Sequence, residues 1–172
     1  NNIQAFPIGY FTKPSFKRIP ESNTAGYMQV DSVTVTSSAS ISNMQLFVAL
    51  NHGQLSDLRI TLIAPTGDST IVWDNNYGIN SQMENLITVF DDNADSSLVS
   101  GKYTDFSPTI KPLNLFSTAF SGKNPQGVWR LRVTDFYNGN TGYLYTWGLR
   151  FNNSTGVEEN YSDIIPNQYV LE

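Results

Sequence analysis

Residues 57–67 read Asp57-Leu58-Arg59-Ile60-Thr61-Leu62-Ile63-Ala64-Pro65-Thr66-Gly67. After the first residue, apolar side chains occupy every second position, and Arg59 and Thr61 lie between them. Successive side chains of a strand point to opposite faces, so this stretch predicts a strand with one buried face. Pro65 presets φ for the second position of a type I turn, and Gly67 suits the fourth. We therefore expect the chain to turn sharply where this strand ends.

The same alternation recurs along the chain. It is found in residues 30–35, 44–50, 69–74, 84–90, 127–135 and 143–151. Clusters of Gly, Asn, Pro and Ser separate these segments, as is typical of turns. No segment of roughly 12 or more residues sustains an apolar period of 3.6, so we expect no substantial helix. The pattern predicts an all-β domain, a β-sandwich with a jelly roll of about eight strands and with Trp129 and Trp147 in its core.

The composition excludes several classes of function. The 172 residues include no cysteine and a single histidine, His52. A disulfide framework, a thiol nucleophile, a cysteine-bound zinc site and a histidine-rich metal site are therefore excluded. The formal net charge of −5 argues against nucleic-acid binding, because phosphates are neutralised by clustered Lys and Arg. The longest apolar run, Leu46 to Leu50, is far shorter than the roughly 20 residues of a membrane helix, so we expect no membrane span.

The two ends of the chain lack the alternation. Residues 1–18 contain Pro7 and Pro14 without any apolar period, and we expect them to form an extended linker. The pattern stops after Phe151, and residues 152–172 are expected to be a second linker. The chain has no initiator Met and no signal-like N-terminus, so we expect a piece of a longer protein.

His52 is the candidate general base that the sequence offers. Asp57 lies five positions further on, so a His–Asp dyad is one interpretation, although no Gly-x-Ser-x-Gly elbow accompanies it. The other interpretation, which we favour, is a strand-end residue that hydrogen-bonds a neighbouring loop. Asp91 and Asp92 are adjacent and would face opposite sides of a strand, so they do not make the carboxylate pair of a glycosidase. We therefore assign no catalytic residue.

Five motifs follow one another along the chain. They are His52 to Gly67; Phe90-Asp91-Asp92-Asn93-Ala94; Pro112-Leu113 with Phe116 and Gly122-Lys123; Gly127 to Asp135; and Gly142-Tyr143-Leu144 with Trp147-Gly148-Leu149. In this order they resemble the P domain, or Homo B domain, of proprotein convertases and bacterial subtilisin-like serine proteases. With Ile19-Pro20-Glu21 the resemblance spans about residues 19–151, and Ala64 stands where Ser is usual.

The resemblance implies a galactose-binding-like jelly roll without catalytic activity of its own. By resemblance, residues 19–151 pack against and stabilise the catalytic domain of a secreted subtilisin-like serine endopeptidase, or help it to engage substrate. The alternative is a carbohydrate- or protein-binding module, such as an adhesion module, attached to another secreted enzyme. A charged fraction of 15% is low for a soluble protein and agrees with secretion.

Four acidic residues near the predicted strand ends are candidate metal ligands: Asp57, Asp91, Asp92 and Asp135. Calcium takes several oxygen ligands, including carboxylates and loop carbonyls. Asp135 is in phase with the buried residues of its strand, so its carboxylate must find a partner. Bacterial P domains are similar at these positions, with Asp95 nearby, and some bind structural calcium. We therefore expect the four acids to share one Ca²⁺, the alternative being that they cap turns by accepting backbone N–H bonds.

Aromatic residues make up 13% of the chain, so a glycan-binding face is also considered. Trp73, Tyr77, Tyr137 and Tyr145 are the possible contributors. For Trp73, which follows an apolar strand, we favour core packing.

The C-terminal residues carry a second resemblance. Ile165-Pro166-Asn167-Gln168-Tyr169-Val170-Leu171-Glu172 is similar to the approach to the C-terminal sorting domain of type IX secretion substrates in Bacteroidetes-like bacteria. The characteristic Asn-Tyr-Pro-Asn-Pro motif of that domain is not part of the sequence. The resemblance implies that residues 152–172 lead toward such a domain, and that the protein is extracellular, with type IX secretion to the cell surface as its route.

Overall fold

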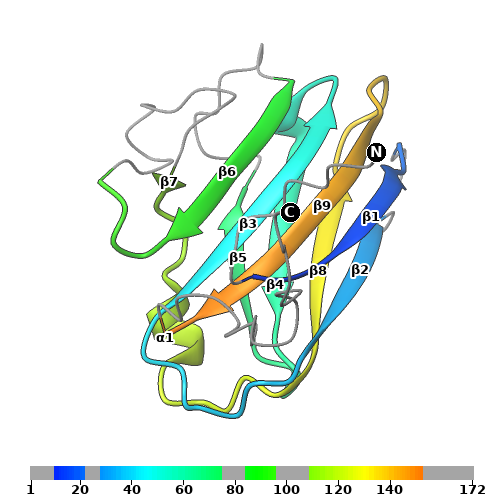
Figure 1. The fold of residues 1–172 in the computed structure, drawn as a ribbon. Helices are drawn as coiled ribbons and strands as arrows, with labels where there is room; N and C mark the ends of the chain where they lie inside the picture. The colour runs from blue at the N-terminus through cyan, green and yellow to red at the C-terminus, as the bar shows by residue number, and fades with distance from the viewer. Residues whose placement is uncertain (1–9, 22–27, 75–83, 96–108, 153–172) are drawn as a thin grey trace, which may run out of the picture.

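The computed structural model describes residues 10–21, 28–74, 84–95 and 109–152, which form two facing β-sheets (Figure 1). One sheet has five strands, in the order β1 (Phe11–Ile19), β9 (Gly142–Phe151), β3 (Met44–His52), β6 (Asn85–Asp91) and β7 (Thr109–Ile110). The other has four strands, in the order β2 (Met28–Val35), β8 (Gly127–Asp135), β4 (Leu58–Ile63) and β5 (Ser69–Trp73). The helical segments within these ranges are short: η1 (Leu55–Asp57) and α1 (Phe116–Phe120).

The strand order is that of a jelly roll. If the two-residue β7 is set aside, strands that follow each other in the chain lie in opposite sheets, except for the hairpin of β4 and β5. All the strand pairs are antiparallel apart from β6 with β7. Eight antiparallel strands crossing in this way between two sheets are the double Greek key of the jelly roll. The predicted β-sandwich of about eight strands is therefore confirmed.

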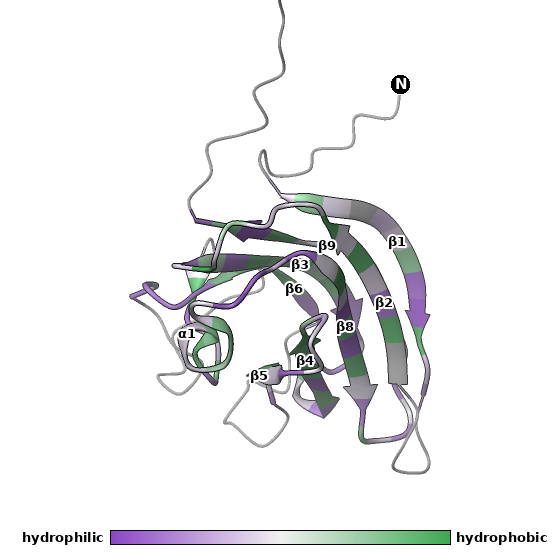
Figure 2. Cartoon of the chain, turned by 90° about the horizontal axis from the view of Figure 1, so that it is seen from below, coloured by the Kyte–Doolittle hydropathy of each residue, from purple (hydrophilic) through white to green (hydrophobic). Residues whose placement is uncertain are grey.

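The core lies between the sheets and follows the period-two pattern. Figure 2 shows hydrophobic and hydrophilic residues alternating along the strands. Trp129 and Trp147 are fully buried, as predicted, and Trp73 joins them. The indole N–H groups of Trp73 and Trp129 donate to backbone carbonyls at 3.1 and 2.7 Å, so these large side chains are buried without an unpaired donor.

Residues 11–18 belong to the sheet, although the sequence predicted a linker over residues 1–18. They form most of β1, which pairs antiparallel with β9. The alternation is hidden because the pairing register shifts between Pro14 and Lys17, where Phe16 adopts a positive φ of 42°. β1 is the edge strand of its sheet, a position that tolerates proline. The linker prediction is therefore wrong for this segment, while residues 1–9 and 153–172 lie outside the described residues.

The two ends of the sandwich carry different loops. At one end β3 finishes at His52, η1 leads into β4, and β8 turns back into β9. At the other end β3 begins and β6 finishes beside α1. A strand rises roughly 3.3 Å per residue, so the two ends of β3 are more than about 20 Å apart. Among the described helices, none is long and apolar enough to cross a membrane.

Candidate functional site

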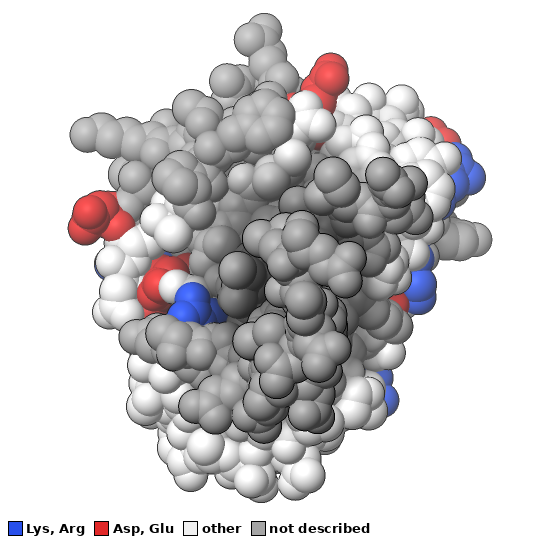
Figure 3. All heavy atoms as spheres, viewed as in Figure 1, with Lys and Arg blue, Asp and Glu red and all other residues white. Residues whose placement is uncertain are grey.

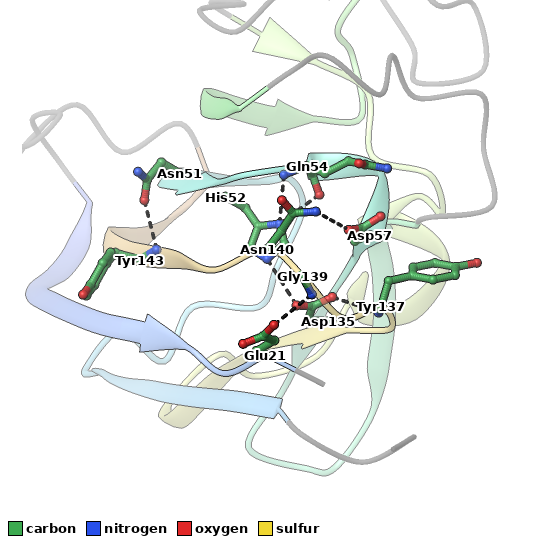
Figure 4. Close-up of polar contacts among 10 residues, drawn as sticks. All are labelled: Glu21, Asn51, His52, Gln54, Asp57, Asp135, Tyr137, Gly139, Asn140 and Tyr143. Atoms are coloured by element: carbon green, nitrogen blue, oxygen red, sulfur yellow. Dashed lines mark hydrogen bonds and ion pairs between the residues drawn. The ribbon is translucent and has the colours of Figure 1, made fainter. Parts of the chain in front are cut away.

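The sole histidine and Asp135 form a buried pair at the end of the sandwich where β3 and β8 finish (Figure 4). His52 is 1% exposed and Asp135 is 0% exposed. The His52 Nε2 lies 3.2 Å from the Asp135 Oδ2, and the Tyr137 N–H donates to the other carboxylate oxygen at 3.0 Å. Burial, with Asp57 adding to its effect, raises the pKa of Asp135, while the Tyr137 N–H and His52 oppose the rise.

The His52 ring is fully used by these structural contacts. The Nε2 atom lies 3.2 Å from the Asp135 carboxylate, and the Nδ1 atom lies 3.3 Å from the Gln54 backbone nitrogen. The Gln54 carbonyl oxygen also lies 2.9 Å from Nδ1. Neither ring nitrogen contacts a hydroxyl group in the described part of the chain. The interpretation of His52 as a strand-end residue bonded to a neighbouring loop is confirmed, whereas the suggested dyad with Asp57 is wrong because Asp135 is the acid at Nε2.

Asp57 ends η1 beside this pair and lines a pocket. Its side chain is 4% exposed, and its Oδ2 accepts a hydrogen bond from the Asn140 Nδ2 at 3.3 Å. The backbone carbonyl of Asp57 accepts the Phe136 N–H at 3.0 Å, which ties η1 to the loop between β8 and β9. The pocket measures about 370 Å³ and is lined by Gln54, Ser56, Asp57, Tyr137, Asn138 and Asn140.

Asp91 and Asp92 lie at the opposite end of the sandwich, beside α1. Asp91 accepts the Asn93 N–H at 2.8 Å and the Gln45 side-chain amide at 2.7 Å, one on each carboxylate oxygen. Asp92 likewise uses both oxygens, which accept the backbone N–H groups of Phe116 and Ser117 at 2.8 Å each. Asp92 therefore satisfies two of the backbone donors that the first turn of a helix leaves open.

The four predicted metal ligands do not fit a single calcium ion. The structure brings Asp57 and Asp135 together at one end and Asp91 and Asp92 together at the other, and the length of β3 separates the pairs. Asp91, Asp92 and Asp135 each accept backbone N–H bonds, as the turn-capping alternative predicted. Among the described residues, no three His, Cys, Asp or Glu side chains are grouped so that they could hold a metal ion. Calcium binding itself stays a prediction.

Asp31 is an important buried residue that the sequence analysis missed. It lies on β2, is 2% exposed, and accepts a hydrogen bond from the Trp147 Nε1 of the other sheet at 2.9 Å. Lys17 forms an ion pair with it at 3.1 Å, and the Ser15 hydroxyl donates to the same carboxylate. Burial alone would raise the pKa of Asp31, but the hydrogen bonds from Ser15, Trp147 and Lys17 outweigh it and hold the pKa well below its usual range. Its phase with Val33 and Val35 was the available signal.

The aromatic candidates are divided among different environments. Trp73 is fully buried, which confirms the core interpretation, and Tyr77 lies outside the described residues. Tyr145 is 41% exposed on β9, within 6.0 Å of the Phe16 ring. Tyr137 is 55% exposed and, among the candidates that the structure describes, it alone lines the Asp57 pocket.

The comparisons with known proteins agree with this architecture. The family model described as the proprotein convertase P-domain matches residues 41–151, which begin before β3 and end with β9. The Aeromonas extracellular serine protease of Aeromonas sobria is 31% identical over 96 residues, a span that covers 56% of this chain and 13% of the protease.

Two crystal structures of an Aeromonas sobria serine protease are among the structural matches. The structure of its complex with the chaperone gives a TM-score of 0.48 at 21% identity, and the structure of the serine protease gives 0.45 at 19%. Each comparison covers 87% of this chain and 28% of the solved chain. The chain thus spans much less than half the length of the proteins it matches.

Proposed function

We propose a function from the family of this chain, which belongs to the proprotein convertase P-domain family. The chain is the accessory domain of a subtilisin-like serine endopeptidase. In this role the domain makes and breaks no bonds. It packs against the catalytic domain and stabilises it, or helps it to engage substrate. The observation that carries the proposal is the family match over residues 41–151, which contains most of both sheets.

The state of His52 supports a non-catalytic role. A general base needs a nitrogen within hydrogen-bond reach of the group that it deprotonates. Both His52 nitrogens are engaged by Gln54 and Asp135, and the ring is almost completely buried. The chain contains no second histidine. A triad of the serine-protease kind would therefore have to come from another part of the protein.

Docking requires exposed apolar surface, which the five-stranded sheet provides. Phe16, Tyr143 and Tyr145 form a patch, here called the aromatic patch, with side chains 70%, 37% and 41% exposed. The Phe16 and Tyr143 rings stack at 5.3 Å. Interfaces between domains of one chain bury about 600–1,500 Å², and aromatic side chains are enriched in the cores of such contacts. We assign the aromatic patch to the contact with the catalytic domain.

The proposed location of the protein is extracellular. The Aeromonas sobria relative is named as an extracellular protease. The low charged fraction of this chain agrees with that location. Type IX secretion is proposed only from the resemblance of residues 165–172, which lie outside the described residues.

Structural calcium is a separate part of the proposal and rests on the family resemblance. Because the four acids lie in two separate pairs, one ion held by all of them is not proposed. Isothermal titration of calcium into the chelator-treated chain tests whether either pair contributes to a site. Calcium-dependent heat with a raised melting temperature would support a structural calcium site. The absence of both would contradict it.

The accessory role is tested in the full-length protein that contains this chain. Its coding sequence is expected to carry the Asp, His and Ser motifs of a subtilisin-like catalytic domain. Replacing Phe16 and Tyr145 by Ser in that protein should shorten the half-life of protease activity at raised temperature, while the melting temperature of the isolated chain stays unchanged. A coding sequence for a glycosidase or a repeat adhesin would instead favour the alternative, a carbohydrate- or protein-binding module.

A further inference from the structure

We propose that the pocket at Asp57 binds a sugar ring of a glycan through its hydroxyl groups. The pocket lies at the end of the sandwich marked by His52 and Asp135 (Figure 4), whereas the aromatic patch lies on the outer face of a sheet. This activity is separate from docking of a catalytic domain, so either proposal can fail without the other.

The chemistry of the lining favours a neutral ligand with many hydroxyl groups. Six residues line the pocket: three carry side-chain amides, one a hydroxyl, one a carboxylate and one a phenol ring. None of the six is Lys or Arg, so the pocket offers no cationic side chain to a phosphate or a sulfate. Amides and carboxylates together supply both donors and acceptors, which is what adjacent sugar hydroxyls need because each hydroxyl also donates and accepts.

The hydrogen bonds inside the pocket match a hydroxyl ligand better than a metal ion. Asn140 directs its amide NH₂ group toward the Asp57 carboxylate at 3.3 Å, so a donor and an acceptor lie side by side. Gln54 likewise donates through its Nε2 to the Ser56 hydroxyl at 3.0 Å. A calcium ion needs six to eight oxygen atoms converging at about 2.4 Å, and an NH₂ group at the carboxylate works against that arrangement. The volume of about 370 Å³ also exceeds what a bare ion would fill.

Tyr137 provides the apolar wall that a sugar ring requires. Its side chain is 55% exposed, although its backbone N–H is fixed by the buried Asp135 at 3.0 Å. Figure 4 shows the Tyr137 ring extending outward on the same side as the Asp57 carboxylate. An exposed aromatic ring with an apolar face and a polar tip suits contact with the C–H face of a pyranose. The Tyr137 ring would thus contact the apolar face of the sugar, and the polar side chains of the pocket would bond its hydroxyl groups.

The loop between β8 and β9 is held in place before any ligand arrives. The Gly139 N–H donates to Glu21 at 2.8 Å, and the Gly53 N–H donates to the Thr141 carbonyl at 3.1 Å. Asn140 lies against Gly53, where an added Cβ would be 2.7 Å from the Asn140 Oδ1. A site whose groups are already ordered loses less conformational entropy on binding. Gly53 is therefore assigned as the residue that leaves room for Asn140.

The experiment uses the 172-residue chain and two probes. A glycan array identifies binding glycans, and titration with galactose, glucose, mannose and N-acetylglucosamine, followed by NMR, measures binding of single sugars. We expect at least one glycan to bind with a dissociation constant that Tyr137→Ala weakens by tenfold or more. Val128→Ala is the control, because it shortens an exposed apolar side chain near the other end of β8, and it should leave the dissociation constant unchanged.

Two further variants keep the proposal falsifiable. Asn138→Ala changes an exposed side chain of the same lining and should weaken binding several-fold without lowering the melting temperature. Asp57→Asn should abolish binding, and its melting temperature shows whether the fold is retained. Absence of binding to every glycan and sugar, or binding that Tyr137→Ala and Asn138→Ala leave intact, would overturn the proposal. So would calcium binding that Asp57→Asn removes in a chain that binds no sugar.

Discussion

Replacing Asp31 by Ala tests a buried polar link between the two sheets. The change leaves the fully buried Trp147 without an acceptor for its indole N–H, which costs about 1–3 kcal/mol. It also removes the Ser15 hydrogen bond, worth about 1 kcal/mol, and the Lys17 pair, worth at most about 1 kcal/mol because the Lys17 side chain is 39% exposed. We therefore expect a loss of about 3 kcal/mol in the free energy of unfolding.

Urea unfolding followed by tryptophan fluorescence measures this loss, and a thermal scan should show the melting temperature falling by about 6–12 °C for a chain of this size. Asp68→Ala is the control, because it removes an ion pair with Lys123 in which both side chains are well exposed, and it should leave the midpoint unchanged. An equal midpoint for the Asp31 variant and the wild type would refute the role of Asp31 as a link between sheets.

The lowered pKa of Asp31 predicts that the free energy of unfolding depends on pH. The pKa of Asp31 is lower in the folded chain than the ordinary value of about 3.9, so its ionised form is favoured by folding. Its contribution is present above about pH 4 and is lost as the pH falls further toward the folded pKa. The stability difference between the wild type and Asp31→Asn should therefore shrink below about pH 4. A difference that stays constant from pH 6 to about pH 2.5 would contradict this assignment.

Three further predictions concern other parts of the fold. His52→Ala removes a hydrogen-bond partner from the buried Asp135, and urea unfolding should show a loss of about 1–3 kcal/mol; an unchanged midpoint would contradict the pairing. Gly142→Ala places a Cβ 2.0 Å from the Asn51 carbonyl oxygen, so its melting temperature should fall well below that of the wild type. A melting temperature equal to that of the wild type would contradict the close approach of β3 and β9 at this position. Asp92→Ala removes the acceptor at the start of α1 and should lower the free energy of unfolding by about 1–2 kcal/mol. Amide hydrogen exchange should become faster at Phe116 and Ser117, and unchanged exchange there would argue against capping.

The strands were predictable where side chains alternate without interruption. β4, β8 and β9 are recognised from apolar residues in one phase, because one face of each strand is buried by the opposite sheet. β1 was not predicted, because the irregularity at Phe16 shifts the phase of the side-chain alternation in the middle of the strand. β7 and α1 are too short to carry a period, at two and five residues.

The site was predictable only in part, because its contacts join residues far apart in the sequence. The phase of Asp135 correctly indicated a buried carboxylate in need of a partner, but the partner, His52, lies 83 positions away. The clustering of acids near strand ends did not show which end each acid occupies. That depends on strand direction, which places Asp91 opposite Gln45 at the beginning of β3 and Asp135 beside His52 at its end. Asp31 shows that the phase argument, applied to every strand, would have found a second buried carboxylate.

Charged residues make up 15% of the chain, which is consistent with docking through neutral groups. Figure 3 shows few charged side chains among the described residues on the face that Figure 1 presents, and the coloured groups are scattered. Scattered charges give little long-range attraction to a partner. Contact with a catalytic domain is therefore expected to depend on the aromatic patch, and weakly on salt concentration.

The accessory role is tested most directly by deleting residues 10–152 from the full-length protein and measuring the half-life of its peptidase activity at raised temperature. We predict that the deletion shortens the half-life at least tenfold, and that adding the purified chain back restores part of it. A full-length protein without peptidase activity, or a half-life that neither the deletion nor the added chain changes, would contradict the account.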